Sequence, residues 1–323
     1  MKVKALLIAS LVAFSSLNAA SLIDEAKNSG LVALPKDQKG VDEILKQNGV
    51  KASEFTLEKA ELGKKLYFEP RLSKSGIISC NTCHNVGLGG TDGVSTAIGH
   101  KWTANPHHLN SPTVYNAVLN NTQFWDGRAG TLADQAKGPI QADPEMATPA
   151  KLAVEKISSL PEYVSEFKKI YGKSGVNFDN IADAIANFER TLITPSRFDK
   201  FLEGDEKALI KEEQKGLKLF IDKGCVACHN GVNLGDFKGD ANGMVKTPTL
   251  RNVAETAPYF HNGAIWNLKD AIKEMGSVQL GIKISDKEAK SIETFLKSLT
   301  GTKPAIVYPQ LPISTEKTPK PEL

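Results

Sequence analysis

Apolar residues recur at helical spacing in two distant stretches of the chain. The first stretch consists of Ile181, Ala184, Ile185, Phe188 and Leu192. The second consists of Ala289, Ile292, Phe295, Leu296 and Leu299. Each set falls on one face of a predicted helix, because residues three and four apart share a face. Pro195 ends the first helix, while the second begins at the Ser285/Glu288 capping pattern and stops at Gly301.

A helix predicted earlier in each unit contains the motif Gly-x-x-Leu-aromatic. The motif occurs at Gly63–Tyr67, in a helix predicted to start near Thr56, and again at Gly216–Phe220. Glycine lets one helix approach another closely because it has no Cβ. We therefore expect each terminal helix to cross the helix that contains its glycine.

Further short motifs, which lie between these helices in each unit, repeat at matching intervals along the sequence. The matched pairs are Ser111–Asn116 with Thr247–Asn252, Phe124–Gly127 with Phe260–Gly263, and Leu132/Asp134 with Leu268/Asp270. Agreement at this many points indicates an internal duplication. We expect an all-α chain of two domains, residues 21–195 and 196–302, with no substantial sheet.

Several segments lie outside the repeated unit. A short helix is expected around Leu22–Ala26, and extra helical material at about 149–172, where Pro161 suits a first helical turn. Residues 301–323 contain five prolines, so the tail 303–323 is expected to run extended over the surface.

Residues 1–20 have the pattern of a secretory signal peptide. Lys2 and Lys4 precede an apolar run from Ala5 to about Leu17, and the small residues Ala19 and Ala20 follow. The run is shorter than the roughly 20 residues needed to span a bilayer, and no other stretch is long enough. We expect a protein exported to the periplasm without an integral membrane span.

The net charge says little about partners. The formal charge of the whole chain is +3, and removal of Lys2 and Lys4 leaves +1. Acidic cofactor groups would lower it further. Such a near-neutral protein is a poor candidate for binding nucleic acid.

Four cysteines stand in two Cys-x-x-Cys-His sequences, Cys80–His84 and Cys225–His229, and these are the only cysteines in the chain. This pentapeptide is the attachment sequence for c-type haem. Two thiols three positions apart on one helical turn can each bond to a vinyl group of the porphyrin. The adjacent histidine then directs its imidazole at the iron. The sequence predicts two covalently bound haem c groups, with His84 and His229 as axial ligands.

Three other uses of the cysteines are possible. Zinc ribbons usually separate their cysteine pairs by about 15–20 residues, far less than here. Thioredoxin-like pairs occur on βαβ units, and no strand pattern surrounds either pair. Structural disulfides suit an exported protein. The export signal, however, also places the chain where c-type haem is attached.

The second axial ligand of each iron decides what that haem can do. Met275 follows the second attachment sequence at the end of a predicted helix, and Met244 is the reserve. His/Met ligation raises a haem's reduction potential. The first unit has no methionine in the corresponding place. His100, His107 and His108 follow its attachment sequence instead.

His100 ends a glycine-rich loop, a stretch that glycine leaves with little to hold it in one conformation. A ligand on such a loop can leave the iron, and a haem with an open face binds small molecules. From the residues alone, a surface or hydrogen-bonding role for His100 is equally consistent.

With these residues in place, the chain closely resembles the bacterial di-haem cytochrome c peroxidases over nearly its whole mature length. Besides the two attachment sequences, the likeness rests on these motifs: Gly99-His100, Asn110–Thr113, Phe124–Arg128, Gln135–Pro139, Pro144–Met146, Pro258–His261 and Met275.

The resemblance implies roles for individual residues. It makes the N-terminal haem the low-potential peroxidatic one, with His84 proximal and His100 the distal ligand that departs. It makes the C-terminal haem, with His229 and Met275, the high-potential entry site for electrons. It further implies an electron relay at Trp125, a distal-pocket pair of Gln135 and Glu145, and an interdomain calcium bound by Asn110, Thr256 and the carbonyl of Pro258.

The implied reaction is reduction of H₂O₂ to two waters. The two haems store the two electrons required, Glu145 transfers the proton as acid and base, and Gln135 orients the peroxide. The electrons would come from a small cytochrome c or a copper protein, and the family commonly forms homodimers. Two alternatives stay open: a MauG-like maturation oxidase, which carries a Tyr ligand where this chain has Met275, and a non-catalytic di-haem electron carrier.

Overall fold

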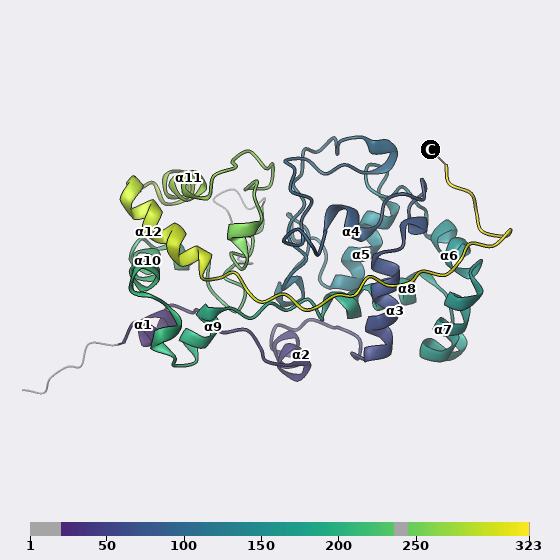
Figure 1. Cartoon of the computed structure of the whole chain (residues 1–323), viewed down its shortest axis with the longest axis horizontal. Coiled ribbons are helices and arrows are strands. Elements are labelled where there is room, and N and C mark those ends of the chain that lie inside the picture. The colour runs from purple at the N-terminus through teal and green to yellow at the C-terminus, as the bar shows by residue number, and fades with distance from the viewer. Residues whose placement is uncertain (1–20, 236–244, 323) are drawn as a thin grey trace, which may run out of the picture.

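The computed structural model describes residues 21–235 and 245–322 and is helical throughout (Figure 1). Within these residues the only β pairings are isolated bridges. The predicted signal peptide and Met244 lie outside the described residues. Two helical units lie side by side along the longest axis of the molecule (Figure 1). The predicted all-α, two-unit architecture is therefore confirmed.

The longer helices number twelve within the described residues. Before the first unit come α1 (Leu22–Asn28) and α2 (Gln38–Gln47). The first unit contains α3 (Leu57–Tyr67), α4 (Cys80–Cys83), α5 (Leu132–Gln141), α6 (Ala150–Ser158), α7 (Pro161–Tyr171) and α8 (Phe178–Glu189). The second contains α9 (Arg197–Leu202), α10 (Lys211–Asp222), α11 (Leu268–Leu280) and α12 (Asp286–Lys297).

Seven short 3₁₀ turns, again within the described residues, connect these helices. They are η1 (Pro70–Leu72), η2 (His100–Trp102), η3 (Ala117–Leu119), η4 (Gly172–Ser174), η5 (Glu206–Ala208), η6 (Cys225–Ala227) and η7 (Val253–Glu255).

A crossing of two helices organises the first unit. Thr56 caps α3 by accepting the N–H of Lys59. Halfway along α3, Gly63 lies against α8 so closely that an added Cβ would be 1.8 Å from the carbonyl oxygen of Ala184. Leu62 and Leu66 are buried beside this contact. The crossing of α3 and α8, which the glycine motif predicted, is confirmed.

The second unit repeats the crossing with α10 and α12. A Cβ on Gly216 would be 2.1 Å from the carbonyl oxygen of Ser291. Ser285 caps α12 and forms the predicted capping box with Glu288. Phe220 packs against Phe295 with ring centroids 5.4 Å apart, which closes the core.

Backbone details repeat between the units as well. Asn116 and Asn252 are both left-handed, with φ of 61° and 62°, and each precedes a 3₁₀ turn. Their N–H groups donate to the carbonyl oxygens of Leu192 and Leu299, just beyond the two terminal helices. The duplication predicted from the sequence is thus present in the fold.

The leader differs from expectation in two ways. Residues 21–195 were expected to form one domain, but α1 packs against α9 and α10 of the second unit, with Ile23 and Ala26 buried in that unit's core. The helix α2, which the sequence reading did not predict, packs Val41 and Leu45 near η3. Its apolar residues Val41, Ile44 and Leu45 stand three and four positions apart, so the helical signal was present in the sequence.

The terminal helix of the first unit is shorter than predicted. It ends at Glu189, and Leu192 lies in the turns that follow, ahead of Pro195. The extra helices α6 and α7 are present, and Pro161 opens α7 as expected.

The tail runs without helix or strand, as predicted, and crosses the first unit (yellow in Figure 1). Tyr308 packs against Phe68, with ring centroids 4.7 Å apart. Near the end of the chain, the N–H of Glu322 donates to the carbonyl oxygen of Lys74 at 3.0 Å. The tail therefore links the end of the second unit to the far side of the first.

No helix within the two described ranges has the length and apolar character that crossing a lipid bilayer would require.

Replacement of Gly63 by alanine tests the helix crossing. The added methyl group would meet the backbone of α8, which cannot move aside as a side chain can. We expect Gly63→Ala to lower the free energy of unfolding by about 1–3 kcal/mol, the usual cost of overpacking. Chemical denaturation measures it. Gly130→Ala is the matched control, since a Cβ there meets nothing within 4 Å. Equal stability of the two variants would contradict the crossing.

Candidate haem sites

The first attachment sequence forms the helical turn α4, with Ser79 and Thr82 making a capping box at its start. The Nδ1 atom of His84 lies 2.8 Å from the carbonyl oxygen of Pro112. A carbonyl accepts only from an N–H, so Nδ1 carries the proton and Nε2 is left for a metal. Burial lowers the pKa of His84, which keeps the imidazole neutral, as ligation requires.

The second attachment sequence forms η6 and places His229 in the same state. The Nδ1 atom of His229 lies 3.1 Å from the carbonyl oxygen of Leu234. Burial lowers the pKa of His229 to about 4. Both histidines named as axial ligands are therefore oriented by a carbonyl and neutral.

None of the four cysteines forms a disulfide, and all are half-buried. Burial raises the pKa of Cys80 and Cys83, to about 12 for Cys83, and that of Cys225 to about 11. Within the described ranges, no three His, Cys, Asp or Glu side chains gather as a metal site would need. The zinc alternative therefore finds no support, while a covalently attached macrocycle fits the spacing.

His100 presents a buried atom that needs a partner. It is 9% exposed, and its Nδ1 atom is buried without a hydrogen bond. Its backbone N–H donates to the carbonyl oxygen of Glu145 at 2.8 Å, and a Cβ on Gly99 would be 2.0 Å from the carbonyl oxygen of Pro144. The loop expected to be loosely held is thus anchored at its backbone, and only the imidazole lacks a partner. A haem iron is the kind of group that this orphaned side chain fits.

The helices α5 and α11 correspond in the two units. Each begins at a capping side chain, Thr131 or Asn267, that accepts from the N–H of an aspartate three residues later. Eight residues beyond each cap stand Pro139 and Met275. Met275 was predicted to stand at the end of its helix, but it lies inside α11. Proline has no donor atom in its side chain, so α5 cannot supply the ligand that α11 offers. Met146 packs into the first core.

Gln135 lies one turn before Pro139 and on the same face of α5. The equivalent residue in α11 is Ala271, one turn before Met275. The first unit therefore places an amide where the second has a methyl group, on the helix face that carries Met275 in the second unit.

Glu145 follows α5, and its carbonyl oxygen accepts the hydrogen bond from the N–H of His100. The two residues are therefore neighbours. Burial raises the pKa of Glu145, while the charges of Arg128 and His107 lower it. The negative charge of Glu145 in turn contributes to the raised pKa of Cys83, after the larger effects of burial and Asp92. Glu145 is thus a partly desolvated carboxyl within electrostatic reach of the first attachment turn.

Trp125 lies where the two units meet. Its Nε1–H donates to the carbonyl oxygen of Asn110 at 2.9 Å, and its own carbonyl accepts from the N–H of Lys246 at 2.6 Å. Its ring is 6.4 Å from that of His261, edge to face. Trp125 therefore contacts the second unit at two places.

The three predicted calcium ligands lie on two loops that contact each other. The N–H of Asn110 donates to the carbonyl oxygen of His261 at 2.8 Å. The Asn110 amide also donates to the carbonyl oxygen of Val94, and the Thr256 hydroxyl donates to that of Val253. Ca²⁺ takes six to eight oxygens, so these residues with Pro258 would need waters to complete a shell. The calcium site stays a prediction.

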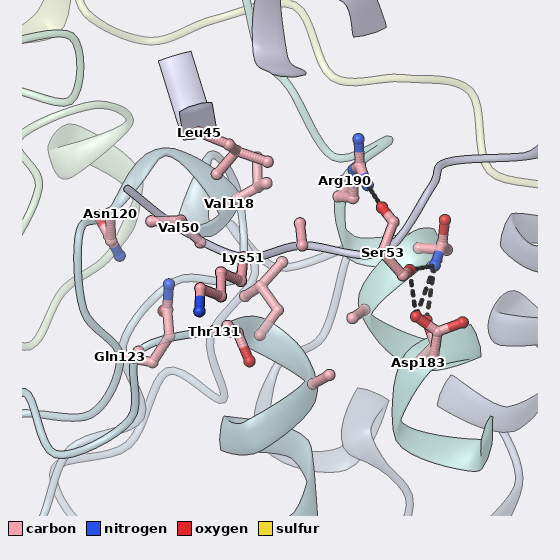
Figure 2. Close-up of a pocket in the computed structure, with 16 residues that line it drawn as sticks. Leu45, Val50, Lys51, Ser53, Val118, Asn120, Gln123, Thr131, Asp183 and Arg190 are labelled. Carbon is pink, nitrogen blue, oxygen red and sulfur yellow. Dashed lines mark hydrogen bonds between the residues drawn. The ribbon is translucent and has the colours of Figure 1, made fainter. Parts of the chain in front are cut away.

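A cleft opens elsewhere in the first unit (Figure 2). Val50, Lys51 and Ser53 of the leader form one wall, and Thr131 and Asp183 belong to the other elements that line it. None of the predicted site residues lines this cleft.

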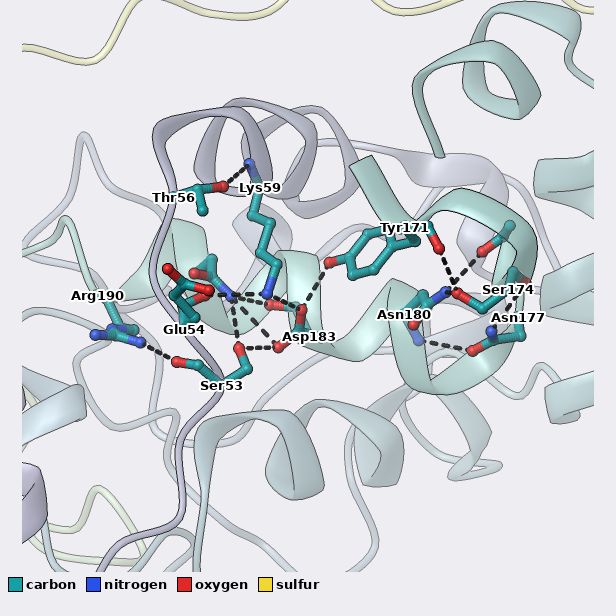
Figure 3. Close-up of polar contacts among 12 residues, drawn as sticks. Ser53, Glu54, Thr56, Lys59, Tyr171, Ser174, Asn177, Asn180, Asp183 and Arg190 are labelled. Atoms are coloured by element: carbon teal, nitrogen blue, oxygen red, sulfur yellow. Dashed lines mark hydrogen bonds and ion pairs between the residues drawn. The ribbon is translucent and has the colours of Figure 1, made fainter. Parts of the chain in front are cut away.

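The leader beside this cleft is fixed by a polar cluster around Asp183 (Figure 3). Its carboxylate accepts from the hydroxyls of Ser53 and Tyr171 and pairs with the ammonium of Lys59 at 3.3 Å. Arg190 donates to the carbonyl oxygen of Ser53 at 2.8 Å. These bonds make the wall of the cleft a structural connection to α8.

Sequence reasoning missed two polar residues beside the first attachment turn. The hydroxyl of Tyr67 donates to the carbonyl oxygen of His84 at 2.5 Å. Glu189 is 7% exposed, and its Oε2 atom is buried without a hydrogen bond. The signal was available, since Glu189 interrupts an apolar face of the predicted helix where the second unit has leucine.

Comparison with known proteins agrees with this geometry. Residues 57–207 match the family described as di-haem cytochrome c peroxidase, and residues 213–300 match cytochrome c. The chain is 50% identical over 295 residues to the cytochrome c551 peroxidase of Pseudomonas aeruginosa, covering 82% of this chain and 85% of that protein. It is 46% identical to the protein of the same name from Nitrosomonas europaea, covering 81% and 85%.

More distant relatives belong to the same group. The methylamine utilization protein MauG of Methylorubrum extorquens is 34% identical, with 81% of this chain and 84% of that protein covered. A crystal structure of a MauG-like protein associated with microbial copper homeostasis shares the fold, with a TM-score of 0.68 at 24% identity over 84% of this chain and 93% of that one. From its duplicated haem-attachment turns and from relatives that match most of its length, this chain belongs to the di-haem cytochrome c peroxidase family.

Proposed function

We propose that this protein is a di-haem cytochrome c peroxidase that reduces H₂O₂ to two waters with electrons from a small redox protein. The observation that carries the proposal is the asymmetry of the two units. One offers a thioether at Met275, and the other offers an orphaned imidazole at His100 beside the carboxyl of Glu145. One haem site is then closed and the other can open.

Haem c, when bound at each attachment turn, supplies the iron that meets the peroxide and the store for two electrons. The first would be held by Cys80, Cys83 and His84, and the second by Cys225, Cys228, His229 and Met275. The closed site suits electron entry, since Met ligation raises the reduction potential.

The protein's own residues then handle the protons. In H₂O₂ + 2 e⁻ + 2 H⁺ → 2 H₂O, one peroxide oxygen must lose a proton and the other must gain protons before it leaves. Glu145 takes the proton from the first oxygen and returns it to the second, and Gln135 holds the peroxide by its amide. Trp125, which touches both units, relays electrons between them. The imidazole of His100 would move aside to make room for the peroxide.

Met275 favours this reading over a MauG-like maturation oxidase, which has a Tyr ligand at that place. The named relatives agree, since those called cytochrome c551 peroxidase are more similar to this chain than MauG is. A simple electron carrier would need no carboxyl and amide around a site without a second fixed ligand.

The setting belongs to the proposal as well. We place the protein in the periplasm, exported by the signal peptide at residues 1–20. A small cytochrome c or copper protein donates the electrons, a calcium ion bound by Asn110, Thr256 and Pro258 links the two units, and the protein forms a homodimer.

Replacement of Glu145 tests the acid–base role. Because the carboxylate must be unprotonated to accept a proton and burial raises its pKa, turnover should fall on the acid side at a pH above the ordinary glutamate value of about 4.3. Glu145→Gln should lower kcat by about 10²–10⁴-fold and remove this acid limb. Both haem spectra should be unchanged. Glu155→Gln, on the exposed face of α6, is the control. Normal turnover by Glu145→Gln would remove the role.

Replacement of Trp125 tests the relay. Trp125→Phe keeps an aromatic ring but loses the N–H that bonds Asn110. We expect slower electron transfer between the haems in stopped-flow spectra, with peroxide binding unaffected. Trp266→Phe, at an exposed tryptophan, is the matched control. Transfer at the wild-type rate in both variants would leave Trp125 a packing residue.

A half-reduced spectrum separates the enzyme from a carrier. Ascorbate should reduce only the C-terminal haem. The ferric N-terminal haem should then become high-spin and bind cyanide as His100 departs, and added Ca²⁺ should favour this state. If that haem stayed six-coordinate through every redox state, the peroxidase proposal would fail.

A further inference from the structure

The duplicated frame allows the two units to be compared residue by residue. Gly63 touches the carbonyl of Ala184, and Gly216 touches that of Ser291. Counting five residues along each terminal helix brings Glu189 opposite Leu296. Three residues further, the carbonyls of Leu192 and Leu299 accept equivalent hydrogen bonds, which confirms the register.

The same register pairs Tyr67 with Phe220, because each stands four residues after its crossing glycine. The Tyr67 hydroxyl donates to the carbonyl oxygen of the axial ligand His84 at 2.5 Å. Phe220 has no such group, and its ring lies 6.4 Å from that of His229. At two matched positions, the first unit has polar groups where the second has hydrocarbon.

Glu189 is as buried as its leucine counterpart, at 7% exposed against 3% for Leu296. Burial alone raises the pKa of Glu189, to about 8, and one carboxyl oxygen has no hydrogen bond. Its charge acts on the first attachment turn, since it contributes, after burial, to the raised pKa of Cys80. The raised pKa of Cys225 has no contribution from a carboxylate.

Other ionisable groups on the packed elements have partners of their own. On α3, Lys59 pairs with Asp183 and Lys65 with Glu166. Arg190, the next residue, forms an ion pair with Asp42. It also donates a hydrogen bond to the carbonyl oxygen of Ser53 (Figure 3). Lys156 of α6 bonds the carbonyl of Ser73. Asp134 and Lys137 of α5 lie near each other, and Lys137 pairs with Asp179. Besides burial, which is the largest effect in both cases, the charge of Glu189 contributes to the raised pKa of Tyr67 and of Cys80.

We propose that Glu189 is the positioning residue that lowers the reduction potential of the N-terminal haem and makes this potential dependent on pH. An unprotonated carboxylate near the iron stabilises the ferric state over the less positive ferrous state. Each electron that enters from the donor protein is then accompanied by one proton taken up by Glu189. In the second unit Leu296 leaves the potential insensitive to pH.

This inference rests on haem attachment at Cys80 and Cys83. The test therefore begins with mass spectrometry of the full-length exported protein, which should show two haem adducts. Absence of the N-terminal adduct would overturn the haem assignment, and this inference with it.

Spectroelectrochemical titration of each haem between pH 6 and 10 then tests Glu189. In the wild type, the ferric-to-ferrous ratio of the N-terminal haem at fixed potential should rise up to tenfold per pH unit in the alkaline part of the range, about 59 mV per unit. The ratio for the C-terminal haem should stay flat. A flat N-terminal profile in the wild type would overturn the inference without any variant.

Glu189→Gln should abolish the slope of the N-terminal haem alone and shift its ratio at pH 10 toward ferrous by about tenfold, about 59 mV. Glu189→Asp should restore a slope, and Tyr67→Phe should keep it, since the carboxyl remains. Glu213→Gln, at a buried carboxyl of the second unit, is the matched control and should change nothing at the N-terminal haem. A wild-type slope in Glu189→Gln, with both haems attached, would overturn this inference and leave the proposed peroxidase function standing.

Discussion

Both units depend on the contact of a glycine in their first helix with the backbone of their last helix. At Gly63 and Gly216 there is no room for a Cβ, so the two helix axes come as close as backbones allow. Four residues after each glycine, Tyr67 and Phe220 lie beside the histidines of the attachment turns, His84 and His229. The glycine contact also sets which side chains of the last helix face the attachment turn. A shift of the crossing would move the cysteines and their histidine together.

On this shared frame, a few substitutions separate the proposed roles of the two units. Pro139 takes the place of Met275, and Gln135 that of Ala271, so α5 lacks a ligand but carries an amide. The loop at His100 presents the imidazole that we propose as the ligand in place of one from α5. Both units keep the Cys-x-x-Cys-His order and a carbonyl acceptor for the histidine Nδ1, while the side chains around them differ.

Hydrogen bonds of side chains and of backbone groups connect the two units. Asn252 donates to the Thr194 hydroxyl, which also accepts from Asn116, so one side chain joins equivalent asparagines of the two units. Trp125 adds a second connection through Lys246. Hydrogen bonds of this kind join the two units at points that are far apart in the sequence.

The sequence by itself determined the helices, the duplication, the glycine crossings and the two attachment turns, because periodicity, caps and Cys-x-x-Cys-His spacing are local properties. It did not reveal that α1 packs in the second unit, that Glu145 lies beside His100, or that Glu189 is buried near Cys80. Those facts join residues far apart in the chain, and no local pattern encodes which distant backbone will cover a side chain. Only the tertiary structure decided them, because burial and the pairing of charges follow from how the helices cross.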